Sequence, residues 1–190
     1  MVLHLSEQVE KIEESTLDGV EKLEVYAPIT TVCKDFSVLC KVYRATLFYM
    51  EGTKILSKLP LSGVCGFEPY LKSSTPDYEG YDSCFPSVKE EHQKIDMAIS
   101  RLYYPYQLSD VYKDKYEKYL SQKYRVATKQ VIVEEDMDIF YWMFQIRKPD
   151  IYMIHEFKEA ALSVKRTEII LFLMNYEQEH FVKKEEKFEL

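Results

Sequence analysis

Glycine is scarce in this chain of 190 residues and absent from its second half. The five glycines all lie at or before position 80, at Gly19, Gly52, Gly63, Gly66 and Gly80. Proline is also rare after that point, at Pro86, Pro105 and Pro149 only. Because glycine weakens helix interiors and favours tight turns, its absence from residues 81–190 predicts helices with short connections.

Long apolar segments are missing as well. The longest uninterrupted apolar runs are Ile139–Phe144 and Ile169–Met174, far shorter than the roughly 20 residues that cross a bilayer. The first five residues, MVLHL, contain neither the basic stretch nor the apolar stretch of a secretion signal. We therefore expect a soluble, cytoplasmic protein that makes no membrane contact.

An excess of positive charge is also lacking. The chain has 25 lysines and arginines against 32 aspartates and glutamates, which gives a net charge of -7. A protein of this charge repels phosphate backbones as a whole, so nucleic acid is disfavoured as a partner. With 46% apolar residues the chain can still build a full core, and its composition is not that of a disordered protein.

The four cysteines show no recognisable pattern. Their spacings match no zinc ribbon, redox pair or compact disulfide framework, and they are Cys33, Cys40, Cys65 and Cys84. We expect four reduced, mostly buried thiols, with a metal site that includes His92 as the open alternative. No cofactor is expected.

Catalytic motifs are absent too. The chain contains no serine nucleophile elbow, phosphate-binding loop or dinucleotide fingerprint. The acidic cluster Glu134–Asp138 fits a solvated helix start or, alternatively, a cation site. The single Glu-x-x-His at Glu177–His180 lacks the second copy that di-iron bundles use. A catalytic Cys65 with His92 is a further alternative, but the sequence favours a protein that is not an enzyme.

The composition divides the chain into three parts. Residues 1–59 form an N-terminal segment, residues 60–94 a connector containing proline and glycine, and residues 95–190 a helical, repeat-like region. In the first part, Leu5–Glu14 suits a short helix, residues 20–26 alternate as in a strand, and the long run Phe36–Met50 favours a helix. We expect one globular unit of the mainly α class, with a few short N-terminal strands.

Helix signals are clearest from residue 95 onward. A helix is predicted over Ile95–Tyr103, another after Ser109 and a third over Gln122–Val133. Asp136 can cap the next helix, Pro149 and Asp150 interrupt the pattern, and Thr167 can cap the last one.

A sequence pattern recurs once near the C-terminus. An acidic residue and six apolar residues occur at Asp138–Phe144 and again 30 positions later at Glu168–Met174. Val131-Ile132 precedes the first copy at the distance at which Ala161-Leu162 precedes the second. A period of about 20–50 residues is typical of stacked supersecondary units.

The second copy, over residues 154–174, resembles the end of an ankyrin repeat. The matching residues are Ala161, Glu168, Ile169, Ile170, Leu173 and Met174, with Ile154-His155 similar to the opening of the first helix. The chain departs from that family in Lys165-Arg166, where glycine is usual, in lacking the Thr-Pro opening, and in its period of 30 rather than 33. The region is also similar to helical tails of bacterial leucine-rich-repeat proteins. The ankyrin resemblance implies stacked antiparallel helix pairs that bind another protein without catalysis.

Tyrosines gather between residues 103 and 124. Tyr112, Tyr116 and Tyr119 recur at helical spacing and are expected to form a core stripe. Tyr103, Tyr104 and Tyr106 flank a proline in a predicted turn, where exposure is expected. Because tyrosine is enriched in interfaces, these three are the predicted partner-binding residues.

Together these features predict a non-catalytic protein that binds another protein through a helical-repeat surface. Two alternatives stay open. One is an acidic inhibitor, of the kind found in phage–host conflict, that blocks a nucleic-acid-binding enzyme. The other is a small enzyme that uses Cys65 or the acidic cluster. The sequence indicates no oligomeric state and no particular partner.

Overall fold

The computed structural model describes residues 2–5, 18–26, 42, 44–61 and 76–181, and the chain divides into two compact units. Unit 1 comprises residues 1–122 and unit 2 residues 123–190. The boundary lies inside helix α5 (Asp110–Glu134) and so coincides with neither predicted boundary. The expectation of one globular unit stays a prediction.

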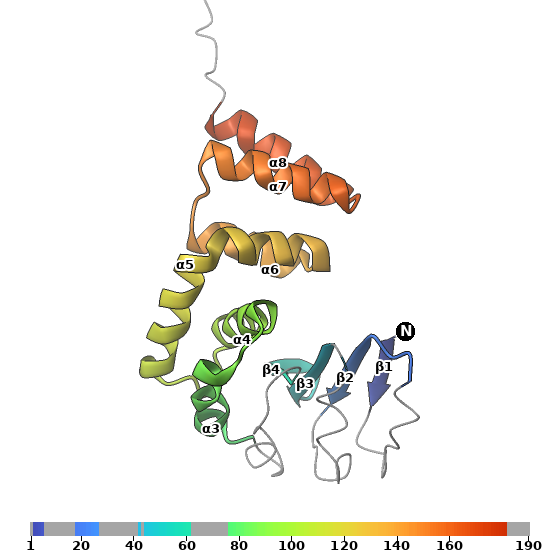
Figure 1. Cartoon of the computed structure of the whole chain (residues 1–190), viewed down its shortest axis with the longest axis vertical. Coiled ribbons are helices and arrows are strands. Elements are labelled where there is room, and N and C mark those ends of the chain that lie inside the picture. Colours follow the sequence, from blue (N-terminus) through green and yellow to red (C-terminus); the bar gives the residue numbers. More distant parts are fainter. Residues whose placement is uncertain (1, 6–17, 27–41, 43, 62–75, 182–190) are drawn as a thin grey trace, which may run out of the picture. The chain divides into compact units, whose positions relative to one another are not determined.

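Unit 1 begins with a four-stranded sheet in the order β1-β2-β3-β4 (Figure 1). The strands are β1 (Val2–Leu5), β2 (Lys22–Tyr26), β3 (Arg44–Glu51) and β4 (Lys54–Pro60). The first three are parallel, and Leu3, Leu23 and Ala45 lie in register, so the strands recur at nearly equal intervals along the sequence. β4 returns antiparallel through a turn in which Gly52 has a φ of 60°, a conformation that favours glycine.

Two expectations for this region need correction or fall outside the described residues. The predicted helix over Phe36–Met50 was wrong for residues 44–50, which form β3. The run lacks glycine and proline, but its β-branched and aromatic side chains fit a strand, and pairing with β2 and β4 satisfies the backbone. Residues 36–41 and 43, and all of the predicted Leu5–Glu14 helix except Leu5, which ends β1, lie outside the described residues. The strand-like alternation at residues 20–26 corresponds to β2.

Among the described residues of unit 1, three helical segments precede α5. They are α3 (Tyr78–Ser83), the short 3-10 helix η3 (Phe85–Ser87) and α4 (Glu91–Tyr103). Within the predicted connector, the sequence indicated little regular structure over residues 60–86, which was wrong for residues 78–83 and 85–86. Asp77 explains the difference, because its carboxylate accepts the backbone N–H of Gly80 and caps α3. Pro86 lies in the first turn of η3, where a missing N–H costs nothing.

The core of unit 1 lies between one face of the sheet and the helices. Leu23, Val25, Leu47 and Leu59 from the strands join Met97 and Ala98 of α4, and all six are almost completely buried. Tyr116 is buried in the same cluster, and Tyr112 and Tyr119 pack against it partly buried. These contacts confirm the predicted tyrosine stripe.

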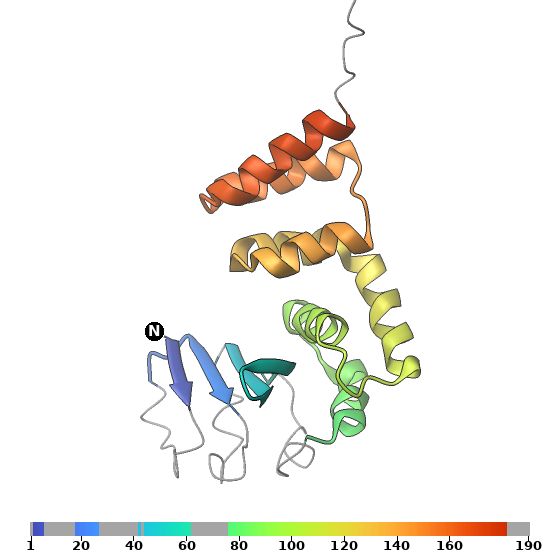
Figure 2. The ribbon, with the colours of Figure 1, turned by 180° about the vertical axis from the view of Figure 1, so that it is seen from behind.

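Unit 2 consists of two helix pairs, the second half of α5 with α6 (Met137–Ile146) and α7 (Ile151–Ser163) with α8 (Thr167–His180). Figure 2 shows α7 and α8 side by side from the opposite direction. As predicted, Asp136 caps α6 through the N–H of Ile139 at 3.1 Å. Asp150, which was predicted only to interrupt the pattern, caps α7 through the N–H of Met153 at 2.8 Å.

Two helix boundaries in this region differ from prediction. The helices predicted around Tyr112–Leu120 and Gln122–Val133 form one continuous helix, α5, because no glycine or proline interrupts residues 110–134. Arg166, rather than Thr167, is the N-cap residue of α8, and it makes no side-chain capping bond.

The structure confirms the mainly helical class with a small N-terminal sheet. Within the described ranges no helix is both long and apolar enough to cross a membrane. The likeness to ankyrin repeats stays a prediction.

Candidate protein-binding surface

The two helix pairs of unit 2 have matching turns at Glu135 and Lys165. Glu135 follows α5 with a φ of 61°, and Lys165 follows α7 with a φ of 59°. At the second turn the N–H of Lys165 donates to Leu162 O at 3.1 Å and that of Arg166 to Ala161 O at 2.9 Å. These two bonds form a Schellman motif, in which a left-handed residue ends the helix. A residue other than glycine can therefore occupy these turns, although the positive φ leaves the backbone of Glu135 and Lys165 strained.

Five pairs of equivalent positions are buried in both helix pairs. They are Tyr124 and Ile154, Ala127 and Phe157, Val131 and Ala161, Ile139 and Ile169, and Met143 and Leu173. The recurring apolar pattern thus corresponds to equivalent positions in two similarly folded helix pairs.

Aromatic rings join the two pairs. The ring of Phe172 in α8 lies 5.4 Å from that of Phe140, 5.1 Å from that of Tyr141 and 5.1 Å from that of Phe144 in α6, centroid to centroid. Tyr176 adds a further edge-to-face contact with Phe144 at 5.2 Å. Such geometry is the favourable one for aromatic rings, so this face of α5 and α6 is filled by α7 and α8.

Polar contacts accompany the rings at both edges of this interface. Glu156 of α7 forms ion pairs with Arg125 at 3.1 Å and with Lys129 at 2.5 Å, both on α5. Arg166 donates to Val133 O at 2.8 Å and also contacts the Glu135 carboxylate, which joins the two turns.

A second set of equivalent positions differs in exposure between the two pairs. Thr128, Ile132, Phe140 and Phe144 are buried in the first pair. Their counterparts Lys158 and Ile170 are only partly buried, while Leu162 is 60% and Met174 46% exposed. The side of α5 and α6 that receives the next helix pair is therefore filled, and in the described residues the same side of α7 and α8 is open.

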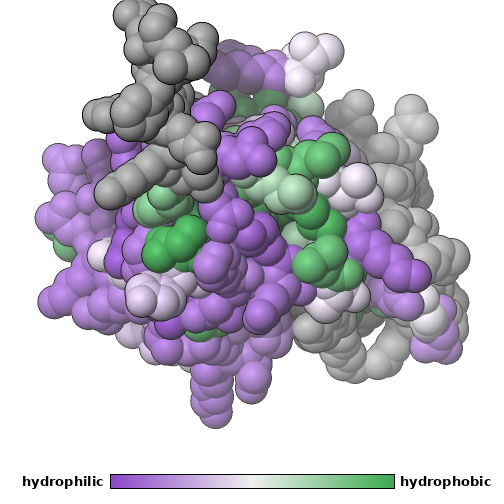
Figure 3. Space-filling model, turned by 90° about the horizontal axis from the view of Figure 1, so that it is seen from above, coloured by the Kyte–Doolittle hydropathy of each residue, from purple (hydrophilic) through white to green (hydrophobic). Residues whose placement is uncertain are grey.

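We call this side of α7 and α8 the open face, defined by Leu162, Ile170, Leu171, Met174 and Phe181. Leu171 and Phe181 are 56% and 39% exposed. Figure 3 looks onto the α7 and α8 end of unit 2 and shows hydrophobic side chains at the surface between hydrophilic ones. Apolar side chains gathered on one surface are typical of sites that contact another macromolecule.

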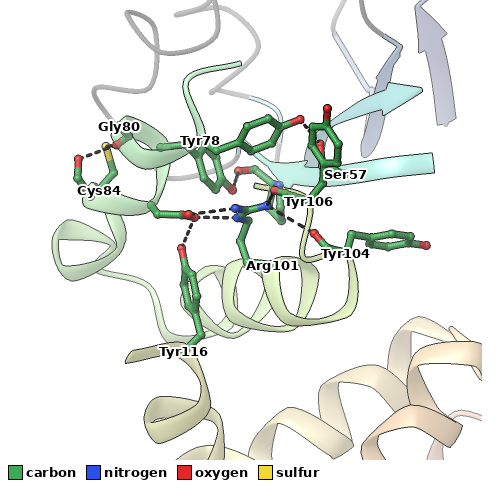
Figure 4. A network of polar contacts seen from close by, with 12 residues as sticks. Ser57, Tyr78, Gly80, Cys84, Arg101, Tyr104, Tyr106 and Tyr116 are labelled. Atoms are coloured by element: carbon green, nitrogen blue, oxygen red, sulfur yellow. Dashed lines mark hydrogen bonds and ion pairs between the residues drawn. The ribbon is translucent and has the colours of Figure 1, made fainter. Parts of the chain in front are cut away.

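A polar network is buried in unit 1 (Figure 4). Arg101 of α4 and Asp82 of α3 are both almost inaccessible to solvent and form a bidentate pair, with N–O distances of 2.8 and 3.0 Å. Tyr116 of α5 donates its hydroxyl to the same carboxylate at 2.8 Å, and Arg101 donates to the carbonyl of Tyr106 at 3.1 Å. The guanidinium also lies 5.0 Å from the ring centre of Tyr78.

The contacts of this network indicate a structural role. Both carboxylate oxygens of Asp82 and all three nitrogens of Arg101 have partners, so each charge is compensated within the unit. Burial and the adjacent Asp82 carboxylate raise the pKa of Tyr116, which keeps its hydroxyl a donor. Burial likewise raises the pKa of Tyr78 to about 12, with its hydroxyl 2.8 Å from that of Ser57. The network therefore links three helices, the 104–106 turn and β4.

The three tyrosines predicted to bind a partner are half-buried rather than exposed. The rings of Tyr103 and Tyr104 contact each other edge to face at 4.8 Å. Tyr106 lies against Tyr78 at 5.5 Å and Tyr49 at 6.0 Å, so its ring is part of the unit 1 packing. Their role in binding stays a prediction.

The other residues singled out from the sequence are dispersed. Cys33, Cys40 and Cys65 lie outside the described residues, while Cys84 is half-buried, with burial raising the pKa of its thiol. In the acidic cluster, Asp136 caps α6 and Glu135 contacts Arg166. Glu177 accepts from Lys158 at 2.6 Å and contacts His155 at 2.8 Å. Across the described part of the chain, no three histidine, cysteine, aspartate or glutamate side chains lie close enough together to hold a metal ion.

The open face itself was missed at the sequence level. Leu171 and Met174 belong to the recurring apolar pattern, which suggested buried positions for both. No local signal separates these residues from their buried counterparts, because both copies of the apolar pattern have the same spacing.

Comparisons with protein families, with curated proteins and with solved structures found no match to this chain.

Proposed function

We propose that the chain is a non-catalytic protein that binds a helical segment of another protein through the open face of α7 and α8. The observation that carries the proposal is the difference in exposure between equivalent positions. Ile132 and Phe144 are buried beneath the second helix pair, whereas their counterparts Leu162 and Met174 are exposed.

A helix is the occupant that this geometry supports. The equivalent face of α5 and α6 is covered by two helices of the same chain, α7 and α8, through apolar and aromatic contacts. Helix-in-groove recognition uses such faces, with apolar anchors at three- and four-residue spacing. Leu171 and Met174 have this spacing on α8.

The experiment compares affinity purification by three forms of the full chain from lysate of its native host. These are the unchanged chain, a variant with both Leu171→Asp and Met174→Asp, and the control variant Val111→Asp. Val111 is 63% exposed on α5 within unit 1, so it matches the face residues in exposure and apolar character. We expect the same partner with the unchanged chain and the control, and at least a tenfold loss with the double variant.

Circular dichroism accompanies the comparison, because the double variant must retain its helices for the loss to be informative. Surface substitutions of this kind change the free energy of unfolding by about 0.5 kcal/mol or less. Retention of the partner by a folded double variant, or turnover of a small molecule without any stable partner, would contradict the proposal.

A further inference from the structure

The charges beside the open face differ from those beside its filled counterpart, and this difference bears on the chemistry of the partner. The inference rests on the proposed function, since it assumes that the open face binds another protein. In the filled interface, two cations on α5 receive one carboxylate from α7. Hydrogen bonding from Lys129 is the main cause that lowers the pKa of Glu156, in line with a paired carboxylate.

The equivalent positions on α7 carry different groups. His155 and Glu159 stand where the first helix pair has Arg125 and Lys129. His155 contacts Glu177 within the same helix pair, at 2.8 Å. Glu159 is exposed and takes part in no ion pair with another described residue. Consider a partner helix that packs on α7 in the way that α7 packs on α5. It would meet the Glu159 carboxylate at the place where α7 itself meets the cations Arg125 and Lys129.

The other charged groups beside the open face are paired within the helix pair, because Glu177 accepts from Lys158 at 2.6 Å and contacts His155 at 2.8 Å. On the side of α8 that belongs to the open face, uncharged residues follow one another at helical spacing, namely Ile170, Leu171, Met174, Asn175 and Gln178, with Phe181 at the C-cap. An uncharged stripe next to a carboxylate without an ion pair, Glu159, favours a partner that is apolar along its length and basic at one flank.

We propose that the partner is an amphipathic helix of a different protein, with a lysine or arginine beside its apolar stripe that faces Glu159. A second copy of this chain suits the face less well. In a symmetric contact through this face, two copies would bring the same carboxylate together, in a chain of net charge -7. A phosphate backbone would be repelled by Glu159, and Lys158, the cation nearest to the stripe, is already paired with Glu177.

The chain itself supplies a pair of probes for the test. One is a fluorescently labelled synthetic peptide of residues 151–180, the helix pair that fills the equivalent face. The other is the same peptide with Glu156→Lys, which places a cation where the inference requires one. Both are titrated against the full chain by fluorescence anisotropy, and against full-chain variants Glu159→Lys, Leu171→Asp with Met174→Asp, and Val111→Asp.

We expect the Glu156→Lys peptide to bind the unchanged chain about threefold more tightly than the unmodified peptide, the size typical of one exposed ion pair. Glu159→Lys should reverse that preference. The double variant at Leu171 and Met174 should weaken both peptides at least tenfold, and Val111→Asp should alter neither.

The outcomes separate this inference from the proposed function. One outcome is binding that depends on Leu171 and Met174, while neither peptide is preferred and Glu159→Lys has no effect. In that case the inference of a basic residue in the partner is wrong, and the proposal that the open face binds a protein stands. If neither peptide binds, or if the double variant binds both normally, the inference is overturned. If the unchanged chain sediments as a dimer that the double variant dissociates, a second copy covers the face and the inference is likewise wrong.

Discussion

Each of the two units contains a segment that recurs along the sequence. In the described residues, other elements cover the last recurring segment of unit 1, whereas that of unit 2 has apolar side chains on its surface. In unit 1, three parallel strands recur at nearly equal intervals, and the antiparallel strand β4 with helix α4 completes the series. In unit 2, the helix pair recurs once, and the second pair presents apolar side chains outward. Repeat proteins usually have capping units with a polar outer face, so the exposed apolar side chains on α7 and α8 are unusual for the end of a stack.

The interiors of the two units differ as well. Unit 1 buries a bidentate ion pair with a tyrosine donor, while unit 2 packs aromatic rings between its helix pairs. A buried ion pair demands complete compensation, whereas aromatic packing tolerates an additional layer. Under the proposed function, unit 2 is the part that binds the partner.

The largest expected effect comes from breaking the ion pair in unit 1. Arg101→Ala leaves the Asp82 carboxylate buried without its cation, and we expect a loss of about 3–5 kcal/mol in the free energy of unfolding. Urea denaturation followed by circular dichroism measures it, with hydrogen exchange of β3 and β4 to locate the change. Arg101→Lys, which keeps the charge but not the bidentate geometry, should cost less. A loss below about 1 kcal/mol for Arg101→Ala would show that the network does not stabilise unit 1.

The second prediction tests the open end of unit 2 with two equivalent aliphatic residues. Ile132→Ala removes a fully buried side chain, so we expect a loss of about 2–5 kcal/mol. Leu162→Ala, at the equivalent position and 60% exposed, should change the free energy of unfolding by about 0.5 kcal/mol. Fluorescence of Trp142, the only tryptophan in the chain, reports on unit 2 during denaturation. Equal costs at the two positions would mean that Leu162 is covered.

The third prediction uses the two left-handed turn residues. Lys165→Gly removes the strain of a side chain at positive φ and should stabilise the chain by about 1 kcal/mol. Glu135→Gly relieves the same strain but loses the contact with Arg166, so its gain should be smaller. Thermal denaturation of both variants measures the difference. Destabilisation by Lys165→Gly would argue against the Schellman geometry of this turn.

The smallest effect concerns pH. Hydrogen bonds from Lys158 and then His155 lower the pKa of Glu177 below its ordinary value of 4.5. A lowered pKa in the folded state means that the contribution of Glu177 is complete above about pH 4.5 and is lost as the pH falls through the folded value. We therefore expect Glu177→Gln to lose less stability than the unchanged chain when the pH falls from 6 to 3, because the variant has no such group to titrate. Denaturation midpoints at a series of pH values check this, and parallel curves would contradict it.

The sequence predicted unit 2 better than unit 1 for physical reasons. Asp136 and Asp150 are local capping signals, and the apolar pattern between them has helical spacing, so short-range information sufficed. β3 was mistaken for a helix because an uninterrupted apolar and aromatic run fits both structures, and only pairing with β2 and β4 decides between them. Leu3, Leu23 and Ala45 recur at nearly equal spacing, but this weak repeat was overlooked beside the clearer one near the C-terminus.

The candidate site was less accessible to sequence reasoning. Nothing in the local sequence indicates that Arg101 packs on Asp82, because Asp82 lies far earlier in the chain. The same holds for Tyr106 and its partner Tyr78. Exposure of Met174 could not be inferred either, because its counterpart Phe144 belongs to the same apolar pattern and is buried. What distinguishes the two positions is whether another helix pair follows, which is a property of the assembled structure.

The short link of residues 147–150 between α6 and α7 gives unit 2 a particular vulnerability. A protease cut or premature stop there would remove α7 and α8 and leave Ile132, Phe140 and Phe144 in water, together with the unpaired cations Arg125 and Lys129. Such a fragment would expose a larger and more aromatic surface than the intact chain and would aggregate or be degraded by quality-control proteases. Shortened forms of this protein should therefore fail through insolubility before any loss of partner recognition could be observed.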